Sequence, residues 1–156
     1  MKIIVLAGGL STERDVSLSS AAGICRTLLE KGHDAFLLDV FMGLEHAPEN
    51  LEDVFTLPDH GLDIVKNIST EEPDLAAVKA SRPDQSDCFF GPNVIELCRL
   101  ADITFLGLHG GEGENGKLQA AFDLLGIKYT GPDSLGCAVA MHKGVAKQIF
   151  LESGVD

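Results

Sequence analysis

The sequence lacks the features that mark exported, membrane-spanning and metal-stapled proteins. Its start, MKIIVLA, contains an apolar run too short for a signal peptide, and no stretch approaches the ~20 apolar residues of a spanning helix. The cysteines form no CxxC pair, which disfavours a zinc site or a disulfide scaffold. We therefore expect a cytoplasmic protein whose cysteines are reduced core thiols, namely Cys25, Cys88, Cys98 and Cys137.

Positive charge is also scarce, with 12 basic residues against 24 acidic ones and a formal net charge of -12. Nucleic acid and anionic membrane surfaces would repel such a chain, so neither is expected as a partner. The 156 residues suffice for one domain with a hydrophobic core. Hydrophobic residues make up 45% of the chain, which excludes disorder throughout.

Hydrophobic patterning predicts an α/β fold of the Rossmann-like kind, an open parallel sheet with helices on both faces. The run KIIVLA at residues 2–7 is typical of a buried parallel strand, and a helix over 16–31 ending at Gly32 leads to a strand over 34–40. Regular patterning resumes after residue 92. It predicts helices at 93–100, 117–125, 134–141 and 144–152, a strand at 103–108 and a short strand at 127–131.

Residues 41–92 differ in composition from the rest of the chain. They hold 11 acidic and 3 basic residues, a net of -8, and five of the six prolines. This composition predicts an acidic surface insertion with short helices or a hairpin that does not join the sheet.

The first glycine-rich loop, GGLSTERDVS, follows the first strand. It matches neither the Walker pattern nor GxGxxG, and Glu13 would repel a pyrophosphate while attracting an ammonium group. Ser11 or Thr12 is expected to cap the helix, and backbone N–H groups there attract anions. Such a loop suits a small zwitterion such as an amino acid, although Glu13 would also be explained by the helix dipole alone.

The second glycine-rich loop, LHGGEGENGKLQ, contains a literal GxGxxG between a strand and a helix. Glu112 and Glu114 fill its variable positions and disfavour a dinucleotide. His109 stands at the carboxyl end of a parallel strand, the edge at which open α/β sheets bind ligands. We expect His109 to orient Glu13 or to steady a developing negative charge, while Glu114 and Asn115 brace the loop by capping the next helix.

Two lysines follow near the end of the chain. Lys143 and Lys147 are four residues apart and share one helix face. They are either solvated surface residues or a contact for nucleotide phosphates. Upstream, Asp133 or Ser134 is expected to cap the helix over 134–141.

Three blocks in order carry a resemblance: AGGLSTERDVSL, LHGGEGENGKLQ and YTGPDSLGCAVAMHK, followed by KGVAKQIFLESGVD. Together they resemble the amino-terminal domain of D-alanine–D-alanine ligases, in the ATP-grasp superfamily. The resemblance covers nearly all of the chain except 41–92, and implies a sheet of the pre-ATP-grasp type. The sequence departs from the family pattern at His142, where Asp or Asn is usual, and at Asn115, where GED is the common motif.

The resemblance implies a reaction and roles for individual residues. ATP phosphorylates one D-alanine to an acyl phosphate, the amine of a second D-alanine displaces phosphate, and the dipeptide enters peptidoglycan synthesis. Glu13 would hold the ammonium group of the first D-alanine, with Val16, Ser17 and His109 in the same subsite. Lys143 would contact ATP, and no metal ligand is expected within residues 1–156.

The resemblance also implies what the chain would need from elsewhere. The second ATP lysine, the carboxylates for Mg²⁺ or Mn²⁺ and an arginine for the tetrahedral intermediate would lie beyond residue 156. We therefore expect a fragment cut at a domain boundary, inactive alone and homodimeric as a full ligase. The alternative is a non-catalytic module of the same fold that binds a small ligand or dimerises.

Overall fold

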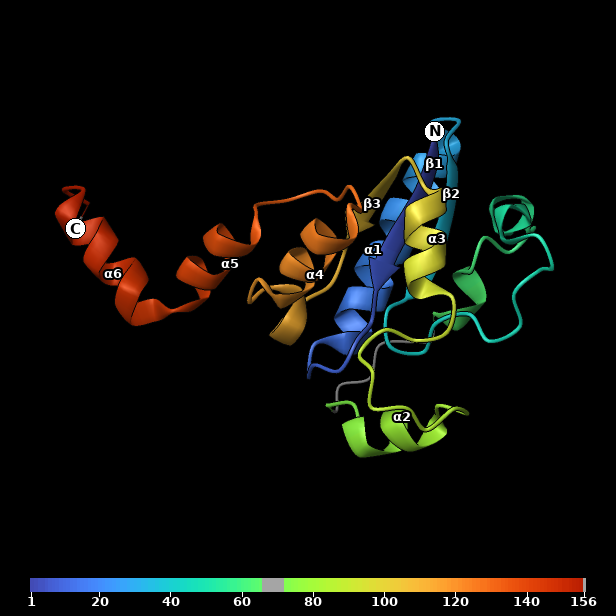
Figure 1. The fold of residues 1–156 in the computed structure, drawn as a ribbon, viewed down its shortest axis with the longest axis horizontal. Helices are drawn as coiled ribbons and strands as arrows, with labels where there is room; N and C mark the ends of the chain where they lie inside the picture. Colours follow the sequence, from blue (N-terminus) through green and yellow to red (C-terminus); the bar gives the residue numbers. More distant parts are fainter. Residues whose placement is uncertain (66–71, 156) are drawn as a thin grey trace.

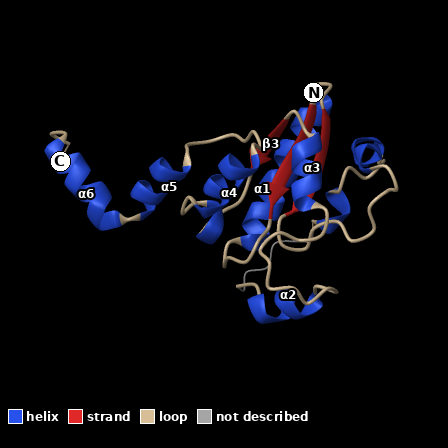
Figure 2. Ribbon diagram, viewed as in Figure 1, coloured by secondary structure: helices blue, strands red, loops and turns tan. Residues whose placement is uncertain are grey.

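A computed structural model describes residues 1–65 and 72–155. Its sheet is parallel in the order β2-β1-β3, formed by β1 (Lys2–Ala7), β2 (Asp34–Asp39) and β3 (Ile103–Leu106) (Figure 2). Ile4 of β1 pairs with Phe36 on one side and with Thr104 on the other. β1 is thus the central strand, which explains why its residues read as one continuous apolar run.

Helices cover both faces of the sheet, as predicted (Figure 1). α1 (Arg14–Glu30) packs on the face that carries Ile3 and Val5. The opposite face, with Ile4 and Leu6, is covered by α3 (Val94–Leu100) and α4 (Lys117–Leu125). Alternate residues of β1 therefore supply two separate cores, as the pleat of a strand requires. The buried apolar residues of these three helices are Leu18, Ala21, Ala22, Cys25, Val94, Leu97, Cys98, Leu118 and Phe122.

Most predicted elements are present with small shifts at their ends. α1 starts two residues before its predicted position and ends one residue early, with Gly32 at φ +79° just after it. β3 stops at Leu106, two residues before the predicted end. The predicted strand at 127–131 is wrong: this segment makes a single bridge, between Thr104 and Tyr129, because the chain turns away after two hydrogen bonds.

The described parts of the acidic segment, 41–65 and 72–92, contain helical turns and no strand. These are η1 (Leu51–Thr56), η2 (Leu62–Ile64) and α2 (Leu75–Ser81). The expectation of a purely superficial segment is wrong for Val54 and Phe55, which are buried in the core beside Leu97. The part of the prediction that falls on residues 66–71 lies outside the described residues.

The last two helices extend away from the sheet (Figure 1). They are α5 (Ser134–Met141), with its predicted ends, and α6 (Lys143–Glu152), which starts one residue early. All four cysteines are free, but Cys88 is exposed, so the expectation of core thiols is wrong for that residue. Within the described residues, no helix has the length and apolarity that crossing a membrane requires.

Candidate functional site

The two glycine-rich loops meet at the carboxyl-terminal edge of the sheet, where open α/β sheets bind ligands. Buried Ser17 of α1 joins them, since its hydroxyl accepts a hydrogen bond from Gly8 N at 3.0 Å and donates one to Gly107 O at 2.8 Å. The Ser11 hydroxyl donates a second link, 2.6 Å long, to the carbonyl oxygen of His109. Side chains of the first loop and α1 therefore fix the backbone of the second loop.

Glu13 lies at the N-cap position of α1 and its carboxylate is turned toward the second loop. A Cβ atom built on Gly110 would lie 2.8 Å from Glu13 Oε2, so the two residues are in contact. Because Gly110 directly follows His109, the structure brings the Glu13 carboxylate to the histidine loop. Glu13 remains exposed. A ligand arriving from solvent can therefore reach this carboxylate.

The expected cap on α1 from Ser11 or Thr12 is wrong. Glu13 occupies the N-cap without a side-chain hydrogen bond, and the Ser11 hydroxyl instead accepts from Glu13 N at 3.2 Å. Ser11 thus links the two loops by hydrogen bonds instead of capping the helix. The expected cap on α5 is confirmed, because the Asp133 side chain accepts a hydrogen bond from Gly136 N at 2.7 Å. At α4 the N-cap is Gly116, which provides no side-chain cap, and of the two expected residues only Asn115 contributes, accepting from Lys117 N at 3.1 Å.

The imidazole of His109 contacts α1 through a residue that the sequence did not single out. His109 Nε2 lies 3.1 Å from the hydroxyl of Ser20. Ser17 and Ser20 are one helical turn apart, so both face the exit of β3. The serine spacing in VSLSS is the signal that would have pointed to this contact.

Arg14 follows Glu13 in the sequence but faces the opposite way. Its buried guanidinium donates to the Asp39 carboxylate and, at 2.7 Å, to Gly9 O. Asp39 also accepts from Phe41 N at 2.9 Å and Met42 N at 3.1 Å. Arg14 is therefore engaged in holding the first loop, whereas the Glu13 carboxylate stays exposed.

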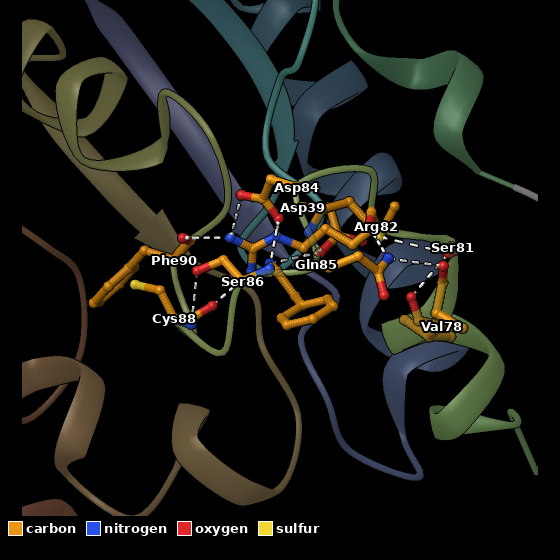
Figure 3. Close-up of polar contacts among 12 residues, drawn as sticks. Asp39, Val78, Ser81, Arg82, Asp84, Gln85, Ser86, Cys88 and Phe90 are labelled. Carbon is orange, nitrogen blue, oxygen red and sulfur yellow. Dashed lines mark hydrogen bonds and ion pairs between the residues drawn. The ribbon is translucent and has the colours of Figure 1, made fainter.

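A second buried arginine shapes residues 82–90 beside the site, as Figure 3 shows. Arg82 donates to Cys88 O at 2.6 Å and to Asp84 Oδ2 at 3.0 Å, and it lies over the ring of Phe41. Its hydrogen bond lowers the pKa of the Asp84 carboxyl. The loop borders a cavity of about 790 Å³ that also touches Leu10 and Glu112 of the two glycine-rich loops.

The remaining predicted site residues occupy different settings. Val16 is the third residue of α1 and is 47% exposed. Ser17 is fully buried, and its hydroxyl is hydrogen-bonded to backbone groups. Lys143 is the exposed first residue of α6, a helix that lies apart from both glycine-rich loops (Figure 1). The structure thus brings Glu13 to the loop that carries His109, against Gly110, and leaves Lys143 elsewhere. His142 caps α6, its Nδ1 accepting from Val145 N at 3.2 Å.

A site for ATP and a divalent metal needs a cation for phosphate and several metal ligands. Lys143 at a helix N-terminus suits one phosphate contact. Among residues 1–65 and 72–155, however, no three His, Cys, Asp or Glu side chains gather as a metal site.

Comparison with known proteins supports a ligase-like fold. The family model described as "D-ala D-ala ligase N-terminus" matches residues 2–132. D-alanine–D-alanine ligases of Lacticaseibacillus casei and Pediococcus pentosaceus are 45% and 46% identical over 99% of this chain, which spans 43% and 44% of their lengths. A crystal structure of the Bacillus anthracis ligase complexed with ATP superposes with a TM-score of 0.61 and 22% identity, covering all of this chain and 38% of that one.

Proposed function

The chain belongs to the family of D-alanine–D-alanine ligase amino-terminal domains, and on this premise we propose that it supplies the first-substrate subsite of such a ligase. The observation that carries the proposal is the Glu13 carboxylate lying against Gly110, beside His109. An exposed carboxylate at the edge of a parallel sheet pairs with a protonated amine through charge-assisted hydrogen bonds.

In the proposed complex, Glu13 binds the ammonium group of the first D-alanine and Val16 lines the path to its side chain. His109 neighbours the carboxylate of the first D-alanine. One oxygen of this carboxylate attacks the terminal phosphorus of ATP, while the phosphorus–oxygen bond to ADP breaks and ADP leaves. The resulting acyl phosphate is attacked by the amine of a second D-alanine. As the carbon–nitrogen bond forms, negative charge develops on the carbonyl oxygen, which is the charge that His109 would stabilise. The carbon–oxygen bond to phosphate then breaks, phosphate leaves and the nitrogen releases a proton to solvent. Ser17 would support the subsite indirectly, because its hydroxyl holds the backbone of Gly8 and Gly107 in place.

The proposed ATP contact of this chain is Lys143, with Mg²⁺ or Mn²⁺ held by residues outside it. ATP supplies the phosphoryl group that activates the carboxylate, and Lys143 would balance phosphate charge. Lys143 and Glu13 must then approach each other in the assembled enzyme. The proposed protein is a cytoplasmic homodimer that makes the D-alanyl-D-alanine unit of peptidoglycan, and the 156-residue chain alone is expected to be inactive.

A second candidate function is a non-catalytic module that dimerises or binds a small ligand. Large apolar side chains exposed on α6, Phe150 at 56% and Leu151 at 68%, favour a surface that is covered in the working protein. Sedimentation of the chain across a range of concentrations tests dimerisation. A monomer at high concentration removes that alternative.

The test of the proposed function is Glu13→Gln in the ligase that carries this domain. Losing one charged contact should lower kcat/KM for D-alanine at least about tenfold. The matched control is Asp15→Asn, which removes the same charge two residues further along and should leave kcat/KM within about twofold. Equal kinetics for Glu13→Gln and the wild type would reject the proposal.

A further inference from the structure

The hydroxyl of Ser20 lies between two polar groups. Only one of them, the imidazole of His109, can act either as a hydrogen-bond donor or as an acceptor toward it. Ser20 Oγ is 3.1 Å from the carbonyl oxygen of Ser17, three residues earlier in α1, and 3.1 Å from His109 Nε2. A carbonyl oxygen only accepts hydrogen bonds, whereas an imidazole nitrogen donates or accepts according to its tautomer. A serine that donates to a carbonyl one turn back is a common arrangement in helices.

The single proton of the Ser20 hydroxyl can be donated to only one of these two groups. When it is donated to Ser17 O, the Ser20 oxygen has lone pairs left and no proton for the imidazole. His109 must then donate its Nε2–H to Ser20. The other ring nitrogen, Nδ1, has no hydrogen-bond partner among the described residues. Its lone pair is therefore the one that the ring offers to a ligand.

We propose that Ser20 is a positioning residue that holds His109 as the Nε2–H tautomer and reserves Nδ1 for the substrate. Two contacts fix the histidine together, because Ser11 binds its carbonyl oxygen at 2.6 Å while Ser20 binds its ring. Because both the backbone and the ring of His109 are held, the imidazole cannot rotate by 180° about its Cβ–Cγ bond without breaking the hydrogen bond to Ser20. The proposal rests on the proposed function only where it assigns the ligand of Nδ1 as D-alanine.

The tautomer is tested on the 156-residue chain itself, without any assumption about activity. Two-bond ¹⁵N–¹H spectra in mildly alkaline buffer, where imidazoles are neutral, report which ring nitrogen of His109 carries the proton. The wild type and Ser20→Thr, which keeps the hydroxyl, should show a protonated Nε2. Ser20→Ala should shift both ring nitrogens toward the averaged values of a free histidine.

A control separates this effect from the loss of a helical hydroxyl. Thr27 makes the same kind of bond on α1, from its hydroxyl to Gly23 O at 2.9 Å, without touching a histidine. Thr27→Ala should leave the His109 signals in place. A wild-type proton on Nδ1, or Ser20→Ala spectra identical to the wild type, would overturn the proposal.

Kinetics in the ligase that carries this domain test the consequence. Ser20→Ala should raise KM for D-alanine about threefold to tenfold with a smaller change in kcat, and Ser20→Thr should restore it. If His109→Ala and Glu13→Gln are both silent, the proposed function fails while the tautomer result stands. If those two variants are impaired and Ser20→Ala behaves as the wild type, the role of Ser20 fails and the proposed function stands.

Discussion

Arg14, the first residue of α1, donates a hydrogen bond from its guanidinium to the carboxylate of Asp39, the last residue of β2, and both side chains are buried. Gly8 lies against the same carboxylate, since a Cβ atom built there would be 2.6 Å from Asp39 Oδ2. The ion pair therefore fixes the turn by which the chain leaves β1 and enters α1. Glu13 takes its position from this turn.

Breaking this ion pair should destabilise the whole domain. Asp39→Asn keeps the shape of the side chain but leaves the Arg14 charge buried and uncompensated, which typically costs about 3–5 kcal/mol. Urea unfolding followed by circular dichroism gives the free energy of unfolding. Asp34→Asn at the exposed start of β2 is the control, expected within about 0.5 kcal/mol of the wild type. Similar values for the two variants would show that the pair does not stabilise the fold.

A methyl group at Gly110 should displace the Glu13 carboxylate. Gly110 has φ +68° and ψ 176°, a backbone region that is essentially restricted to glycine. Its added Cβ would also contact Glu13 Oε2 at 2.8 Å. We expect Gly110→Ala to raise KM for D-alanine about tenfold or more in the ligase, measured by steady-state kinetics.

Gly111→Ala is the matched comparison for that experiment. Gly111 also has a positive φ, +49°, but a Cβ there would meet only Ser11 Cβ at an ordinary 3.6 Å. It therefore carries backbone strain without touching Glu13. A KM for Gly111→Ala equal to that of Gly110→Ala would assign the effect to loop strain and not to the carboxylate.

The single tyrosine of the chain, Tyr129, should lose its proton at a higher pH than an ordinary tyrosine. Burial, followed by its hydrogen bond to Asp123 at 2.9 Å, raises the pKa of Tyr129 to about 12. Absorbance of the phenolate should show a midpoint near 12 in the native chain and near the ordinary value of about 10 in urea. Because the folded state holds this proton more tightly, the Tyr129 contribution to stability is complete below about pH 10 and is lost as pH rises toward 12.

Asp123→Asn separates the two causes of that shift. The amide oxygen still accepts the phenol proton but carries no negative charge, so the midpoint should fall while staying above 10 because the burial remains. An unchanged midpoint in Asp123→Asn would show that Asp123 does not raise the pKa of Tyr129. A midpoint near 10 in the native wild type would show that neither burial nor Asp123 raises it.

Elements whose signals are local could be predicted from the sequence. α4 has its predicted ends because Gly126 adopts φ +67° directly after it, and β1 is recognisable because a central parallel strand is apolar on both faces. Glu13 and His109 could be predicted as neighbours because both follow parallel strands at the same edge. The segment 127–131 misled because its apolar and β-branched residues resemble a strand, although only one bridge forms.

The sequence by itself determined the order of strands and helices, the glycine turns and the charge that the first loop presents to a ligand. Those properties depend on residues close together in the chain. The tertiary structure alone decided that Arg14 pairs with Asp39, 25 residues away, and that Ser20 binds His109, 89 residues away. Such pairings depend on the register and spacing of packed elements. The pattern of one segment contains no record of which distant group will lie against it.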